Sequence, residues 1–117
     1  MKYKLRNTIT EMKIEQRIVN LTRYFHSHFN KEKIIKLIET HIPEIKSLYV
    51  LQWIDYGQGD NQYLLFINKE WLVNIELDDD EEEPLLLLID KIGAPSEAGL
   101  DALIALELEK TGAYFLL

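Results

Sequence analysis

Six carboxylates follow one another from Asp78 to Glu83, between apolar runs that end at Leu77 and resume at Leu85. A hard cation such as Ca²⁺ takes about six to eight oxygen ligands, so such a run could in principle bind one. Calcium loops of the D-x-[DN]-x-[DN]-G type also need a glycine for their sharp turn, and this run has none. We therefore interpret the run as an exposed, poorly ordered connection or as a partner-binding surface, and we predict no metal site.

The histidines and serines do not have the spacing of a catalytic or metal site. His26 and His28 are two residues apart, and helical side chains at that spacing point roughly 200° apart, so they cannot hold one ion. His41 lies at the end of an expected helix, where it can interact with the helix dipole. The segment "GQGD" lacks the lysine and the following helix of a phosphate-binding loop. We predict no enzymatic activity and no cofactor.

The composition is that of one globular domain covering residues 1–117. Hydrophobic residues make up 47% of the chain and charged residues 28%, and there is no cysteine, so packing rather than disulfides must hold the fold. The longest apolar runs, among them Leu85 to Ile89, are far shorter than the roughly 20 residues of a membrane span. The first residues also lack the apolar region of a secretory signal, and we expect a cytoplasmic protein that binds no membrane.

Charge is divided unevenly along the chain. Residues 1–46 contain ten Lys or Arg and five Asp or Glu, a balance of +5, whereas residues 47–117 contain three and fifteen, a balance of -12. The net charge of -7 argues against direct nucleic-acid binding, which depends on cations that neutralise phosphates. The split favours binding of a partner, or packing of the two halves against each other.

The first third of the chain has the period of helices. Thr8 and Glu11 have the spacing of a capping box, and a helix over residues 8–28 would place one apolar stripe toward the core. The stripe consists of Ile14, Ile18, Leu21, Phe25 and Phe29. Asn30 is a good N-cap for a second helix, and Pro43 ends it.

From Lys46 onward the period changes to two, which is typical of strands. "SLYVLQWID", Gln62 to Asn68 and Trp71 to Leu77 predict three strands with short links, which form an antiparallel meander. For residues 84–92 length alone suits strand and helix equally, and we favour a helix because Pro84, Lys91 and leucine-rich spacing suit one. A further helix is expected from Pro95 to Lys110, and "AYFLL" at residues 113–117 is expected to be a final strand or extended segment packed on the sheet. The predicted fold class is therefore α+β, with two N-terminal helices, a three-stranded meander, one or two C-terminal helices and a short final strand.

Aromatic residues concentrate in the predicted strands, where most should be core. Tyr56 and Tyr63 flank the polar turn "YGQGDN", so we expect them to reach the surface. There an aromatic ring beside carboxylates can anchor a basic partner, and Trp71 is a third candidate.

In size, acidity, lack of cysteine, order of elements and the acidic segment Asp78–Glu83, the chain resembles the small immunity proteins that bacteria pair with toxic nucleases, including those of contact-dependent growth inhibition systems. This resemblance implies a non-enzymatic cytoplasmic protein that binds a cognate toxin domain tightly. A nuclease must be basic to hold phosphates, so an acidic partner is attracted to it. The residues we expect to bind it are Asp78, Asp79, Asp80, Glu81, Glu82, Glu83, Glu76 and Asp60, which supply the field, and Tyr56, Tyr63 or Trp71, which supply anchors.

Two other functions remain open at this point. One is a small adaptor or homo-oligomeric domain, such as a homodimer, in which the basic N-terminal helix packs against the acidic half within one chain or across a dimer. The other is an acidic nucleic-acid mimic that inhibits a DNA- or RNA-binding protein. A toxin gene immediately upstream would distinguish the immunity function from both.

Overall fold

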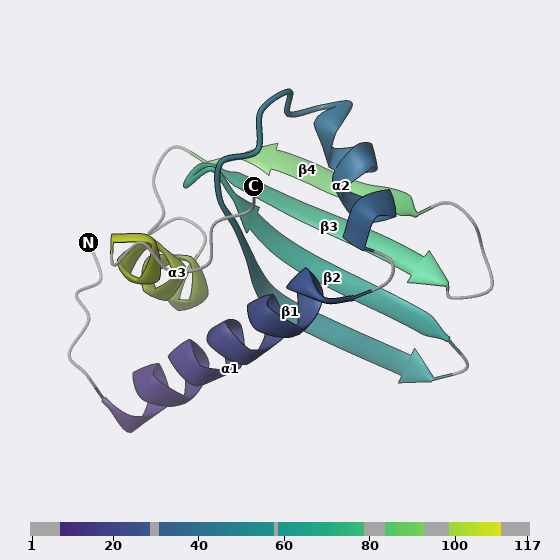
Figure 1. The fold of residues 1–117 in the computed structure, drawn as a ribbon. Helices are drawn as coiled ribbons and strands as arrows, with labels where there is room; N and C mark the ends of the chain where they lie inside the picture. The colour runs from purple at the N-terminus through teal and green to yellow at the C-terminus, as the bar shows by residue number, and fades with distance from the viewer. Residues whose placement is uncertain (1–7, 29–30, 58, 79–83, 93–98, 111–117) are drawn as a thin grey trace.

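The computed structural model describes residues 8–28, 31–57, 59–78, 84–92 and 99–110. They form an α+β fold of helices packed on an antiparallel sheet (Figure 1). In chain order the elements are α1 (Ile9–His26), α2 (Lys31–Glu39), β1 (Leu48–Gly57), β2 (Asp60–Ile67), β3 (Trp71–Asp78), β4 (Leu85–Lys91) and α3 (Leu100–Lys110).

Helix α1 begins with the predicted capping box. The Thr8 hydroxyl accepts a hydrogen bond from the Glu11 backbone N–H at 3.2 Å, and the Glu11 carboxylate accepts one from the Thr8 N–H at 2.9 Å. One turn before the end of the helix the inner face carries Thr22, whose buried hydroxyl accepts a hydrogen bond from the Val50 N–H of β1 at 2.9 Å. The helix is thereby attached to the backbone of the first strand.

The sheet is a continuous antiparallel meander in the order β1-β2-β3-β4. Between β2 and β3 the chain reverses through Asn68 and Lys69, which both have positive φ, at 55° and 65°. Asparagine tolerates this conformation, and here its side chain also fixes the loop before β1. Asn68 Oδ1 accepts from the Lys46 and Ser47 N–H groups at 2.7 and 3.2 Å, and its Nδ2 donates to the Glu44 carbonyl at 2.6 Å.

A β-bulge interrupts β1 at the end of its buried first half. The register moves from Val50 opposite Leu65 to Gln52 opposite Leu64, so Leu51 is the extra residue. Val50 packs on one face of the sheet, while Tyr49 and Leu51 pack on the other. The first half of β1 is therefore covered from both sides.

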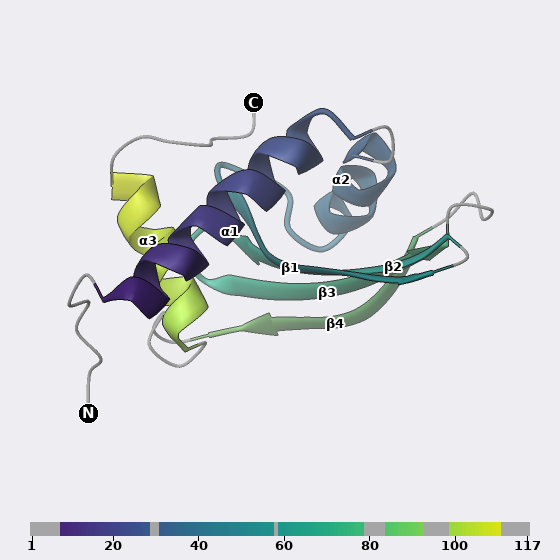
Figure 2. The same cartoon turned by 90° about the horizontal axis from the view of Figure 1, so that it is seen from below.

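Two hydrophobic clusters hold the layers together. The first lies between α2, the C-terminal part of α1 and one face of the sheet, and includes Phe25, Ile38 and Tyr63. The second lies on the opposite face, where α3 and Ile18 of α1 pack on Tyr49 and Phe66. Figure 2 shows α2 and the C-terminal part of α1 on one side of the sheet, with the N-terminal part of α1 next to α3 at one end of it.

The segment 84–92 corrects one prediction, because it forms strand β4 rather than a helix. Its backbone pairs with β3, with Ile89 opposite Val73 and Lys91 opposite Trp71. This pairing continues the meander to four strands and outweighs the local helix preference of leucine. The C-terminal helix α3 begins at Leu100, and the start predicted at Pro95 and the final strand predicted at 113–117 lie outside the described residues.

None of the described helices has the length and hydropathy needed to cross a membrane.

Candidate functional site

Helix α3 covers only one end of the sheet face that carries Tyr49 and Phe66. No described element covers the rest of that face, which lies below the strands in Figure 2. Strand register places residues of all four strands on it, because paired residues of neighbouring strands point to the same face. We call it the open face. Its described residues are Gln52, Ile54, Tyr56, Asp60, Gln62, Asn74, Glu76, Asp78, Leu85, Leu88 and Asp90.

A row of hydrogen bonds crosses the middle of the open face. The Tyr56 hydroxyl donates to Gln62 Oε1 at 2.6 Å, and Gln62 Nε2 donates to Asn74 Oδ1 at 2.9 Å. These bonds join β1, β2 and β3 through side chains, in addition to the backbone ladder. They hold one tyrosine and two amides in fixed orientations at the surface, which lowers the entropy lost when a partner binds them.

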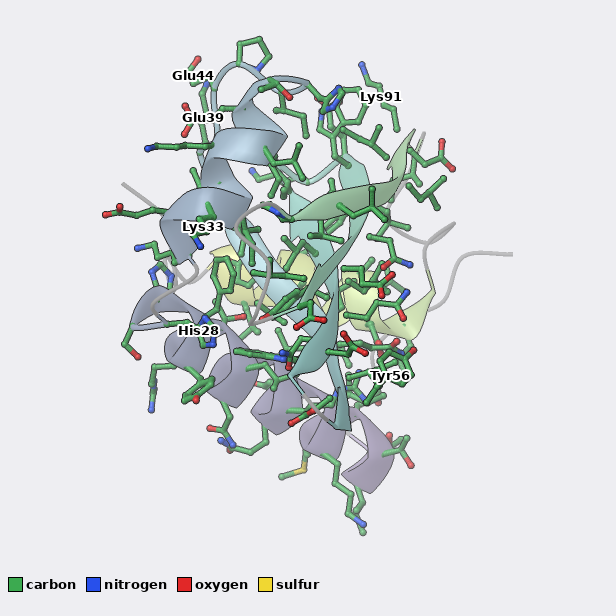
Figure 3. All side chains as sticks on the ribbon, turned by 90° about the vertical axis from the view of Figure 1, so that its right-hand side faces the viewer. His28, Lys33, Glu39, Glu44, Tyr56 and Lys91 are labelled. Carbon is green, nitrogen blue, oxygen red and sulfur yellow. The ribbon has the colours of Figure 1, made fainter. Side chains whose placement is uncertain are left out.

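Large apolar side chains flank this polar row on both sides. On β1, Ile54 is 41% exposed and Tyr56 62%, and on β4, Leu85 is 59% and Leu88 54% exposed. Isolated exposed apolar residues are ordinary, but several on one uncovered face are typical of an interaction surface. Figure 3 shows Tyr56 on the opposite side of the sheet from His28 and Lys33, away from the helices that bury the other face.

The described charged residues of the open face are all acidic. They are Asp60, Glu76, Asp78 and Asp90, and no described lysine or arginine lies on this face. Asp60 and Asp78 are direct partners in the β2–β3 register, so two of the four carboxylates lie next to each other on this face.

The structure brings together four of the predicted site residues. Tyr56, Asp60, Glu76 and Asp78 come from three strands and share the open face. Tyr56 is exposed at the surface, as predicted. The remaining acidic residues, Asp79 to Glu83, lie outside the described part of the chain.

For Tyr63 the prediction of surface exposure is wrong. Its side chain is 0% exposed and belongs to the first cluster, with its ring centroid 4.6 Å from that of Trp53. Strand alternation is the reason, since Tyr63 points away from its neighbours Gln62 and Leu64. Trp71 is half-buried on the same side as Tyr63, beneath the Lys91 ammonium at 5.6 Å, so neither residue belongs to the open face.

Sequence reasoning missed the apolar and amide part of the site. Gln62 and Asn74 were overlooked because polar residues in a strand carry no signal of their own. Leu85, Leu88 and Asp90 were missed because residues 84–92 were interpreted as a helix. Leu88 lies opposite Asn74 in the β3–β4 register, a pairing that alternation alone does not give because of the bulge between Leu86 and Leu88.

On the covered side, His28 lies among aromatic rings. The His28 ring packs edge-on against Trp53 with centroids 4.9 Å apart, and Tyr24 contacts both rings. Burial, followed by the nearby charge of Lys31, lowers the pKa of His26 below its usual 6.5. Within the described ranges no three His, Asp or Glu side chains form a group that could hold a metal ion.

Comparisons with known proteins gave no match to a family model, to a curated protein or to a solved structure. The open face is therefore interpreted from its own geometry and charge.

Proposed function

We propose that this protein is a non-enzymatic binding protein whose open face binds a basic protein partner. The observation that carries the proposal is the combination of four carboxylates with no described cation on an uncovered sheet surface. Exposed Tyr56 and Leu88 supply apolar area for contact, and the oriented amides of Gln62 and Asn74 supply hydrogen-bonding groups. Charges then accelerate encounter and the apolar contacts slow dissociation.

The resemblance noted above suggests which basic protein this is. A toxic nuclease has a cationic substrate groove, and an acidic sheet face that enters it would compete with the phosphates of the substrate. The protein would thus act as an immunity protein that neutralises its cognate toxin domain by tight binding. Repulsion between phosphates and the open face disfavours direct binding of nucleic acid.

Co-expression with candidate basic nuclease toxin domains tests this function. Cells that carry both proteins should survive, and isothermal titration should give a dissociation constant for the purified pair. Glu76→Lys reverses a charge on the open face and should weaken binding by about ten-fold or more. Glu39→Lys makes the same change on α2, on the covered side of the sheet, and serves as the matched control (Figure 3).

Tyr56→Ala tests the apolar part of the same surface. Removal of an interface tyrosine costs about 1 kcal/mol or more when it is an anchor, which corresponds to roughly a five-fold weaker complex. Equal affinity for wild type, Glu76→Lys and Tyr56→Ala would show that the partner binds elsewhere. Absence of protection by the wild-type chain would contradict the immunity function itself.

One observation bears on the adaptor or homo-oligomer alternative. Arg17 Nη2 of α1 and Asp101 Oδ2 of α3 form an ion pair at 2.7 Å within one chain. Part of the contrast between the basic first half and the acidic second half is thus satisfied internally. Sedimentation velocity of the free protein distinguishes a homodimer from a monomer, because a homodimer has twice the mass of the chain.

A further inference from the structure

The two outer strands of the sheet differ in what lies beside them. β1 is flanked by α1, and its Val50 N–H is bonded to the Thr22 hydroxyl. On the other side β4 is the last strand of the sheet, and no described segment runs along its outer edge (Figure 1). The outer edge of a strand presents unpaired N–H and C=O groups, which form a template for a further strand.

The composition of β4 does little to protect this edge. Proteins usually block exposed edges with short strands, prolines or charged side chains. β4 has seven residues without proline, and its charges, Asp90 and Lys91, both lie at its end. β4 has a bulge between Leu86 and Leu88, where its register with β3 shifts. The bulge disturbs pairing locally, and Leu88 to Lys91 remain in regular register with β3.

The side chains of β4 on the open face indicate what an added strand would carry. Leu85 and Leu88 are more than half exposed there, and Asp90 is exposed beside them. A neighbouring strand lies about 4.8 Å away, so its side chains on this face would contact both leucines and the Asp90 carboxylate. Glu76 is roughly 10 Å away, two strand spacings, within reach of a long lysine or arginine side chain.

From this placement we propose that β4 accepts an extended segment of the basic partner as a fifth strand, with that segment's cationic side chains lying over the carboxylates of the open face. The inference rests on the proposed function for the charge of the partner and adds how the partner is held. Backbone hydrogen bonds to β4 would supply affinity, and alternate side chains on the open face would supply specificity. Charge complementarity favours a basic segment over a second copy of this acidic chain.

Capped synthetic peptides test the proposal on the full chain. An eight-residue peptide of alternating lysine and valine should bind at low salt, and the same peptide with glutamate in place of lysine should not. On binding, the outward backbone amides of β4 should become protected from hydrogen exchange. In the free protein the same amides should exchange faster than those directed toward β3.

Backbone methylation separates strand addition from simple charge attraction. In an extended peptide the N–H groups of alternate residues point to opposite edges, and the lysines must face the carboxylates. Methylation of the backbone nitrogens of all lysines therefore blocks one edge of the peptide, and methylation of the backbone nitrogens of all valines blocks the other edge. Both changes leave every side-chain charge in place. One of the two peptides should bind about ten-fold or more weakly than the parent, and the other nearly as well as the parent.

A pair of protein variants completes the test. Leu88→Lys places a cation beside the added strand and should weaken the lysine–valine peptide by about ten-fold. Met12→Lys makes the same chemical change at an exposed position of α1 and should leave binding unaltered. A stronger effect of Met12→Lys than of Leu88→Lys would overturn the proposal.

Each remaining outcome is also decisive. Equal binding of both methylated peptides would mean that the open face attracts cations without adding a strand, so this inference fails and the proposed function stands. Outward β4 amides that are already protected in the free protein would overturn it as well. In that case a doubled mass would identify a second copy as the occupant of the edge, and an unchanged mass would identify another segment of the same chain.

Discussion

At the scale of single residues, Thr22 illustrates how one buried polar group attaches two layers. Thr22→Val keeps the shape of the side chain and removes the acceptor, so the buried Val50 N–H loses its partner. We expect a loss of about 1–3 kcal/mol in the free energy of unfolding. Urea denaturation measures it, and Thr22→Ser, which retains the hydroxyl, should lose less. A valine variant as stable as wild type would show that this bond contributes nothing.

His26 gives the fold a dependence on pH. Because burial lowers its pKa in the folded state, the unfolded chain binds more protons once the pH falls below about 6.5. Its contribution to stability is complete above that pH and is lost below it, as the pH falls toward and through the lower pKa of the folded state. Replacement by glutamine removes this term, so the decrease in melting temperature between about pH 7.5 and pH 5 should be smaller in His26→Gln than in wild type.

His41→Gln is the control for this pH experiment. His41 is exposed just beyond α2, whereas His26 is half-buried and its Nε2 atom is buried without a hydrogen-bond partner. The control should reproduce the pH dependence of wild type. A His26→Gln variant with the same pH dependence as His41→Gln would mean that His26 titrates alike in the folded and unfolded chains.

At the scale of elements, β4 can be tested by the alternation of its side chains. Leu88 is exposed on the open face, and Ile89 packs against the first cluster from the other side. Leu88→Thr should change the free energy of unfolding by less than about 0.5 kcal/mol, and Ile89→Thr should lower it by roughly 1–3 kcal/mol. A helix would bury both residues in one stripe, so equal losses in thermal unfolding would contradict the strand.

Strand β4 also shows which elements of the fold could be predicted from local sequence signals and which could not. Local signals were sufficient where one residue satisfies a backbone group, as in the capping box of Thr8 and Glu11, and where strict alternation marks a half-buried strand, as in β3. They were insufficient for Leu85 to Ile89, because a run of leucines has no period and its conformation depends on pairing with β3.

In the candidate site, too, local signals predicted some residues, and others depended on pairing between strands. The polar turn predicted Tyr56 at the surface, and Glu76, predicted as part of the acidic surface, is exposed on β3. The row through Gln62 and Asn74 depends on cross-strand register, which requires knowing which residue of one strand lies opposite which residue of the next.

At the scale of the whole molecule, the acidic half is expected to control the rate of association with a basic partner. Replacement of Asp79, Asp80, Glu81 and Glu82 by Asn and Gln should slow association and flatten its dependence on ionic strength. Charges grouped on one surface raise association rates by roughly ten- to a thousand-fold at low salt. Stopped-flow mixing over a range of salt concentrations measures this, and thermal stability should be equal or slightly higher.

If this segment contacts only the rim of the interface, where charges act mainly on encounter, dissociation should be nearly unaltered by the four substitutions. Superimposable salt dependences of wild type and variant would show that the four residues form a solvated connection without a role in binding.

The ion pair between Arg17 and Asp101 has a consequence for the order in which the molecule folds. It joins residues 84 positions apart in a chain of 117, so the contact between α1 and α3 closes a long loop that contains all four strands. Contacts of such high sequence separation form late, because the ends of a long loop must first be brought together. Asp101→Asn should therefore accelerate unfolding and leave the refolding rate nearly unchanged, and a chevron plot distinguishes the two. During synthesis α1 would contact β1 before α3 has left the ribosome. The part of α1 that packs against α3 would stay uncovered until then.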